Sequence, residues 1–243
     1  MRTLYYVPII MHSLEELGSL AEPLLKIEKQ IHGPEAEKIY REKVDQYWAT
    51  ITQCLEEEGL NVPEKCKKMH IYVDGLTAQP FYCKTCFDKT GKKRYMDEIA
   101  SNKVRCSFCE RVVEAAVEEF VLKLVKFLIE EGIRPYLIIE KLMERGAKIH
   151  GTESQALLVE EHNLWVNIAK GINAEGIYTG GIDTNVLKKI KLLIERDKFI
   201  AETINQTLPK DEVGILFIGA AHKVDDELKK FPDIKIIPFG GGD

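Results

Sequence analysis

The sequence predicts an α/β fold, a mostly parallel β-sheet flanked by helices, with a small zinc-ribbon-like insert. Short apolar runs such as 4–11 and 213–218 are rich in β-branched and aromatic residues, which is typical of strands buried on both faces of a parallel sheet. Longer segments with apolar residues at helical spacing lie between these runs. Two Cys-x-x-Cys pairs in one polar stretch indicate the insert.

Five short segments are predicted to be strands of this sheet. The first and fourth are continuous apolar runs, and the turn residues Asp74 and Gly75 follow the second. The third begins after Gly146, and the polar stretch 151–154 follows it. In chain order, the predicted strands are 4–11, 70–73, 147–150, 213–218 and 234–238.

Helices are predicted between these strands. Apolar residues recur every three to four positions over 36–58 and 186–208, which are the clearest helices of the chain. Ser13 is expected to cap a shorter helix with an acidic first turn, and the glycine-rich stretch 173–184 predicts a loop. The remaining helices are predicted from Ser13 to the early twenties, at 110–131, 135–144 and 154–161, and after His222.

Length and charge limit the classes of function. A chain of 243 residues can form an α/β domain over 1–79 and 111–243 with a zinc-binding insert at 80–110. A net charge of −5 argues against a whole surface that binds nucleic acid. No secretory signal begins the chain and no apolar run is long enough to cross a bilayer, so we expect a cytoplasmic location and no membrane partner.

The most specific local signal is a set of four cysteines, Cys83, Cys86, Cys106 and Cys109. Their two pairs are separated by nineteen residues, which matches four-thiolate zinc sites. Four thiolates leave no open position, so the predicted zinc is structural; two disulfides, or reduced cysteines without a ligand, are the alternatives. The stretch between the pairs is basic and could contact nucleic acid or be a solvated loop. Its basic residues are Lys84, Lys89, Lys92, Lys93, Arg94, Lys103 and Arg105.

Polar side chains follow four of the predicted strands. His12, Asp74 and His222 come after three of them, and Glu153 lies three residues past His150, which ends another. Because the carboxyl ends of parallel strands meet at one edge of a sheet, these side chains should line one cleft. Each histidine could equally be a capping or hydrogen-bonding residue.

The helix predicted over 186–208 carries a second signal. Asp197 falls near the centre of its apolar stripe, and Arg196 lies about 100° around the helix. A buried carboxylate needs a cation, a metal or several donors, because burying it alone is costly. Asp197 could therefore belong to a functional cleft, or it could be a structural residue that pairs with a lysine or caps a loop.

With these residues, the chain resembles the superfamily that groups TraB/PrgY, the TIKI proteases, ChaN-like proteins and erythromycin esterases. The resemblance rests on an Arg-Asp pair on a late helix, a Gly-x-x-His motif after the next strand, a first strand that ends in histidine, and an acidic residue after the second strand. These are Arg196-Asp197, Gly219-Ala220-Ala221-His222, His12 and Asp74. The resemblance implies an α/β fold whose cleft these residues line, and hydrolysis with or without a metal.

The leading functional hypothesis is a hydrolase that acts on an unknown small molecule or peptide. Its cleft would contain His12, Asp74, Asp197 and His222, with Glu153 or His150 as further candidates. These side chains could bind a second divalent metal, or a histidine could act as general base while Arg196 stabilises developing negative charge.

The alternative is a ligand-binding or regulatory protein whose zinc module contacts nucleic acid or a protein partner. An enzyme-derived scaffold without remaining chemistry is a third hypothesis. The chain has no G-x-S-x-G elbow, which disfavours a covalent serine route, and no nucleotide-binding motif. The sequence leaves association into a homo-oligomer open.

Overall fold

The computed structural model describes residues 1–17, 21–77, 84–90, 96–100, 103–106, 108–114, 125–170 and 182–239. The main sheet has five strands in the order β6-β2-β7-β1-β8. These strands are β1 (Arg2–Ile9), β2 (Met69–Thr77), β6 (Lys148–Glu153), β7 (Val213–Gly219) and β8 (Ile234–Pro238). Every pairing between them is parallel, which confirms the predicted α/β class.

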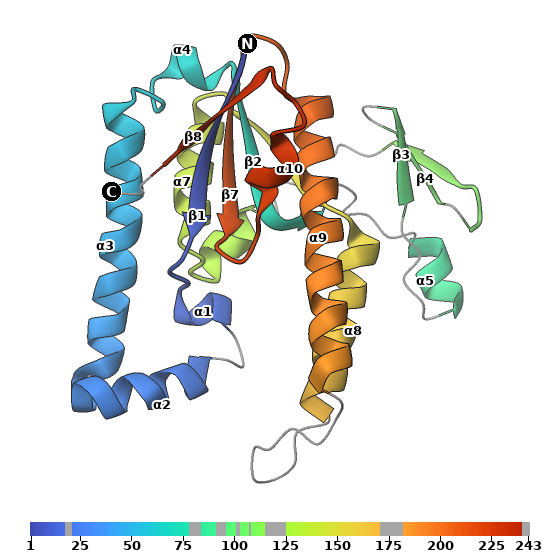
Figure 1. Ribbon diagram of the computed structural model, residues 1–243. Coiled ribbons are helices and arrows are strands. Elements are labelled where there is room, and N and C mark those ends of the chain that lie inside the picture. The colour runs from blue at the N-terminus through green and yellow to red at the C-terminus, as the bar shows by residue number, and fades with distance from the viewer. Residues whose placement is uncertain are drawn as a thin grey trace.

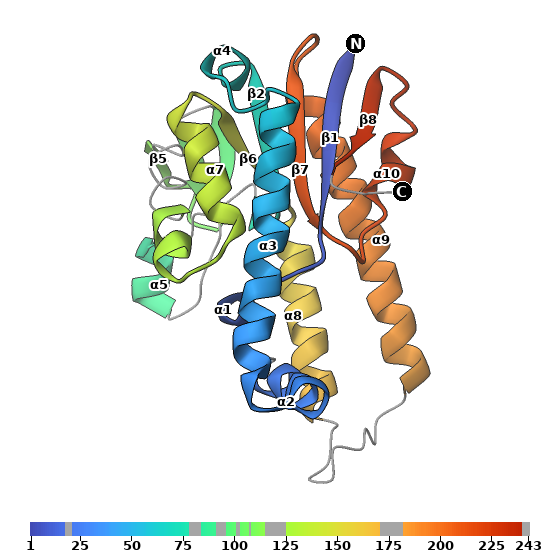
Figure 2. The same cartoon turned by 90° about the vertical axis from the view of Figure 1, so that its left-hand side faces the viewer.

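Helices cover both faces of this sheet (Figures 1 and 2). The long helix α3 and the shorter α7 lie on one face, and α9 and α10 lie on the other. The short helices α1 and α2 lie beyond the carboxyl ends of the strands, beside the lower half of α3. The helices are α1 (Leu14–Leu17), α2 (Ala21–His32), α3 (Ala36–Glu57), α4 (Pro63–Cys66), α7 (Pro135–Glu144), α8 (Gln155–Lys170), α9 (Ile182–Thr207) and α10 (Val224–Leu228).

Strand β7 shows how the sequence pattern builds two cores. Ile215 and Phe217 point into the core under α3 and α7, whereas Leu216 and Ile218 point into the core under α9 and α10. All four side chains are fully buried, as expected for a central parallel strand. Gly214 is required by space, because a Cβ atom there would lie 2.6 Å from Leu4 Cδ1.

A second, smaller sheet follows β2 in the chain. It is antiparallel, and α5 (Lys84–Thr90) accompanies β3 (Met96–Ala100), β4 (Lys103–Cys106) and β5 (Val112–Glu114). The helix predicted over 110–131 was therefore wrong at its start, because the β-branched Val112 and Val113 pair with β4. Residues 115–124 lie outside the described ranges, and helix is seen from residue 125.

Other predicted boundaries moved by a few residues. The strand predicted at 147–150 continues to Glu153, because β6 keeps pairing with β2 as far as Thr77. The helix predicted to end at Glu161 runs on to Lys170. Most of the predicted glycine-rich loop lies outside the described residues, and α9 already begins at Ile182. Among the helices described, none is long and apolar enough to span a bilayer.

Candidate functional site

Five polar side chains meet at the carboxyl edge of the sheet. They come from β2 (Asp74), the last residue of β6 (Glu153), the middle of α9 (Arg196 and Asp197) and the turn after β7 (His222). We call them the carboxyl-edge cluster. All except Asp74 are more than nine-tenths buried. The structure therefore brings together five of the six residues predicted for the cleft.

Arg196 ties the carboxylates of the cluster together. Its Nε and Nη2 donate to Glu153 at 3.1 and 2.6 Å, and Nη2 also donates to Asp74 Oδ1 at 2.8 Å. Its Nη1 donates to Glu161 of α8 at 2.5 Å. These four hydrogen bonds use most of its donors, so the geometry favours a role in positioning carboxylates over the predicted stabilisation of substrate charge.

Sequence reasoning missed Glu161. Its signal was indirect: an arginine beside the apolar stripe of α9 needs acidic partners once it is buried. The helix after β6 offers Glu160 and Glu161, but only the extension of that helix beside α9 shows which of them turns inward.

His222 lies between two aspartates. Its Nδ1–H donates to Asp197 Oδ1 at 2.5 Å, and its Nε2 lies 3.5 Å from Asp74 Oδ2. The second oxygen of Asp197 accepts the backbone N–H of Lys223 at 3.0 Å. Burial alone would lower the pKa of His222, but the bond to Asp197 and the charge of Asp74 outweigh it and raise that pKa. Asp197 thus fixes the tautomer of His222 and favours its protonated form.

The two carboxyls in front of Arg196 have opposite pKa shifts. Burial, with a smaller contribution from the neighbouring Asp74, raises the pKa of Glu153 to about 7 in spite of Arg196. Burial also acts on Asp74, but His222, a hydrogen bond with Glu153, Arg196 and the N–H of Gly219 lower its pKa. Near neutral pH the pair therefore shares a proton that resides mainly on Glu153, while Asp74 stays ionised.

His12, the sixth predicted residue, lies at the rim. Its side chain is 42% exposed, and its Nδ1 is 3.8 Å from Glu16 Oε1. The hydrogen bond with Glu16 raises the pKa of His12, burial opposes it, and the charges of Glu16 and Asp74 add to the increase. The charge of Asp74 therefore acts on His12, but none of the described contacts of His12 is with a cluster residue.

His150 lies in a different place from the predicted one. The prediction that it ends its strand was wrong, because β6 continues to Glu153 and His150 pairs with Tyr72 inside the sheet. His70 Nε2–H donates to Glu212 at 2.5 Å, so its Nδ1 accepts a hydrogen bond of 2.7 Å from His150 Nε2. Burial lowers the pKa of both histidines, that of His150 to about 4. We call these three residues the His70–His150–Glu212 cluster.

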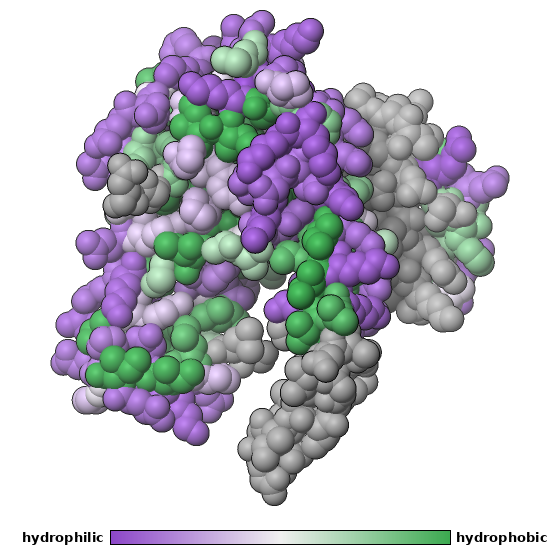
Figure 3. Space-filling model, viewed as in Figure 1, coloured by the Kyte–Doolittle hydropathy of each residue, from purple (hydrophilic) through white to green (hydrophobic). Residues whose placement is uncertain are grey.

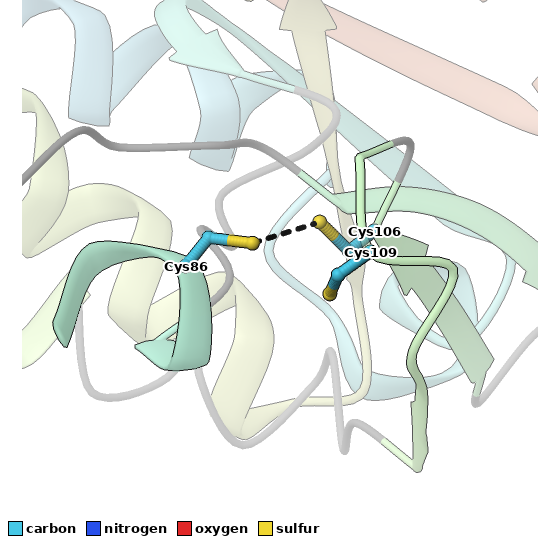
Figure 4. A group of neighbouring side chains, drawn as sticks. All are labelled: Cys86, Cys106 and Cys109. Atoms are coloured by element: carbon cyan, nitrogen blue, oxygen red, sulfur yellow. Dashed lines mark hydrogen bonds between the residues drawn. The ribbon is translucent and has the colours of Figure 1, made fainter. Parts of the chain in front are cut away.

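The cysteine module brings three thiols together (Figure 4). Cys86 from α5 points toward Cys106 and Cys109 at the turn between β4 and β5. The Sγ atoms of Cys86 and Cys106 are 3.7 Å apart, and all three Sγ atoms lie within 4.8 Å of one another. Cys83 lies outside the described residues, as do the basic residues Lys92, Lys93 and Arg94. The three described thiols could bind a metal ion.

No protein-family model matches the sequence, and comparisons with curated proteins and with solved structures find no match. What the carboxyl-edge cluster does is therefore inferred from its geometry.

The carboxylates of the cluster are better arranged to bind the guanidinium of Arg196 than to bind a second metal ion. Asp74, Glu153 and His222 can each present a ligand atom within 4.8 Å of the others. Arg196, however, binds both oxygens of Glu153 and Oδ1 of Asp74, and Oδ2 of Asp74 accepts the N–H of Gly219 at 2.9 Å. A divalent cation would compete with this guanidinium for the same oxygens.

Proposed function

We propose that the carboxyl-edge cluster is the active site of a hydrolase that cleaves an ester or amide with its own acid and base groups. The supporting observation is His222, which is buried between Asp197 and Asp74 with its Nε2 3.5 Å from Asp74 Oδ2. A carboxylate that orients an imidazole beside a second acidic group is a common arrangement for general acid–base catalysis.

In the proposed reaction, Asp74 accepts a proton from water as the water oxygen forms a bond with the substrate carbonyl carbon. The bond from that carbon to the leaving oxygen or nitrogen then breaks, and His222 Nε2–H donates its proton to the leaving group. The products are a carboxylic acid and an alcohol or amine. Asp74 then returns its proton to the neutral Nε2 of His222, which lies 3.5 Å from Asp74 Oδ2, and the cycle closes.

The same cluster supports the proposal that the chain belongs to the superfamily that it resembles. Four of the positions that carry the resemblance, Asp74, Arg196, Asp197 and His222, are members of the carboxyl-edge cluster. The fifth, His12, lies at its rim. These residues come from β2, α9 and the turn after β7, and their convergence at one edge of the sheet is what the resemblance implies.

For the cysteine module, we propose a structural zinc ion held by Cys86, Cys106 and Cys109, with Cys83 as fourth ligand. Tetrahedral zinc with bonds of about 2.3 Å to sulfur places neighbouring sulfurs ~3.8 Å apart. The distance of 3.7 Å between the Cys86 and Cys106 thiols fits that geometry. Such a site would stabilise the small antiparallel sheet, which is too small to form a hydrophobic core of its own.

Hydrolysis of a panel of p-nitrophenyl esters and p-nitroanilides tests the proposed activity. We expect turnover by the wild type and a loss of at least about 100-fold in kcat/KM in His222→Gln. Lys223→Gln is the matched control, because its exposed side chain is adjacent but only its backbone N–H contacts Asp197. Addition of a chelator should leave the rate unchanged. A wild type that hydrolyses no member of the panel, or a His222→Gln variant as active as the control, would contradict the proposal.

A further inference from the structure

The lower half of α9 extends beyond the sheet and exposes apolar side chains. Figures 1 and 2 show this helix running well below the carboxyl ends of the strands. Val186, Leu187, Ile190 and Ile194 are 45 to 66% exposed. Their contacts are therefore incomplete, although helices that pack on a domain normally bury such a stripe.

These side chains lie on the face of α9 that enters the active site. Ile190, Asp197 and Ile204 are spaced by seven residues, so they share one side of the helix. Ile204 is buried under the sheet, and Asp197 binds His222 at the edge of the sheet. The apolar stripe from Val186 to Ile194 therefore continues directly from the catalytic cluster, on the same helix face.

The space in front of this stripe is open. Figure 3 shows a hollow below the sheet between α2 and α9, with hydrophobic residues gathered on α9 beside it. Further exposed apolar residues are Ile27 and Ile31 on α2 and Ile10 just after β1. An apolar group that reaches the cluster from below the sheet could pack along α9.

We propose that the hydrolase acts on uncharged esters or amides of a medium-length apolar acyl chain, and that the chain lies along the exposed stripe of α9. This inference rests on the proposed function. The stripe from Val186 to Ile194 is about 12 Å long at 1.5 Å per residue, which suits a chain of medium length. Because the stripe continues from the cluster on one helix face, we infer that it binds the substrate.

The charge of the cluster supports an uncharged substrate. Asp74, Glu153, Glu161 and Asp197 provide four acidic groups, against the cations Arg196 and His222. Even with Glu153 protonated, the site does not carry an excess of positive charge that would attract an anion. A free carboxylate or phosphate would be repelled on entry, and the carboxylate product would be expelled.

A chain-length series tests this inference. We expect kcat/KM for p-nitrophenyl octanoate to exceed that for the acetate by roughly tenfold or more. Ile190→Asn and Val186→Asn should lower kcat/KM by a factor that increases with chain length, reaching roughly tenfold for the octanoate. Val62→Asn, an exposed position beside α4 at the opposite edge of the sheet, is the matched control. Equal effects at every chain length would overturn the inference while leaving the hydrolase intact.

Two further measurements separate the remaining outcomes. If the stripe instead binds a second copy of the chain, size-exclusion chromatography will show a dimer that Ile190→Asn dissociates, with the chain-length dependence unchanged, and the inference is wrong. If no ester is hydrolysed at all, a dansyl-labelled decyl amide still reports on the stripe. Fluorescence-detected binding that Ile190→Asn abolishes and Val62→Asn preserves supports the apolar site without the activity, and absence of binding refutes it.

Discussion

Acidification should destabilise the fold through the His70–His150–Glu212 cluster. A histidine in an unfolded chain has a pKa near 6.5, whereas burial and the nearby charges of His70 and Lys148 lower the pKa of His150 to about 4. Between these values the unfolded chain binds a proton that the folded protein does not, so stability falls as the pH falls. From about pH 7.5 to about pH 5, the loss from His150 alone is roughly 2 kcal/mol. The lowered pKa of His70 acts in the same direction.

The pH dependence of the free energy of unfolding must be compared between variants, because protonation of other groups stabilises the fold as the pH falls. The pKa values of His222 and Glu153 are raised, so their protonation favours the folded state as the pH falls. His150→Gln removes the titration but keeps an N–H donor for His70. Its free energy of unfolding, from urea titrations followed by circular dichroism, should fall by roughly 2 kcal/mol less than that of the wild type over this pH range.

Tyr72→Phe is the matched control for this experiment. Tyr72 stacks on His150 with ring centroids 5.1 Å apart, and its hydroxyl bonds Thr207. The substitution keeps the ring and removes one hydrogen bond, so it should cost about 1 kcal/mol at every pH. A His150→Gln variant with the same pH dependence as the wild type would refute the reasoning.

Three further predictions follow from the other sites. Arg196→Met should lower the free energy of unfolding by about 3 to 5 kcal/mol, because it leaves buried carboxylates without their arginine. Arg134→Met is the control: it breaks an exposed ion pair and should lower the free energy of unfolding by less than about 1 kcal/mol. In pH–rate profiles, we expect the wild-type rate to change near pH 7, where Glu153 titrates, and Glu153→Gln to remove that change; a profile that Glu153→Gln leaves unaltered would contradict the role of the Asp74–Glu153 pair. Elemental analysis should find one zinc per wild-type chain and none in Cys106→Ser, while Cys66→Ser, buried elsewhere, keeps its zinc.

The parallel sheet and the position of the site could be predicted from the sequence because both follow from local patterns. The apolar run of β7 identifies a central strand, and His222 follows it at the edge where parallel strands place ligands. Asp74 lies near that edge too, but the prediction that its strand ends at residue 73 was wrong, because β2 continues to Thr77. Asp197 could be found because a carboxylate in an apolar helical stripe needs a partner. Its partner is His222, which the spacing alone could not show.

Other features depended on long-range contacts. Val112 and Val113 lie in a helix-compatible pattern, but pairing with β4 makes them a strand. His150 was assigned to a strand end because the pairing of Glu153 with β2 is not visible in a short apolar segment. The role of Glu161 depends on the packing of α8 against α9, and the His70–Glu212 contact joins residues far apart in the chain.

The most direct test of the central proposal is a double-mutant cycle on His222 and Asp197, with kcat/KM for ester hydrolysis as the readout. If Asp197 acts by orienting His222, Asp197→Asn will lower the rate in the wild-type background but have almost no further effect in His222→Gln. If the two effects instead multiply, each residue acts independently, and the acid–base unit proposed for the carboxyl edge of the sheet is wrong.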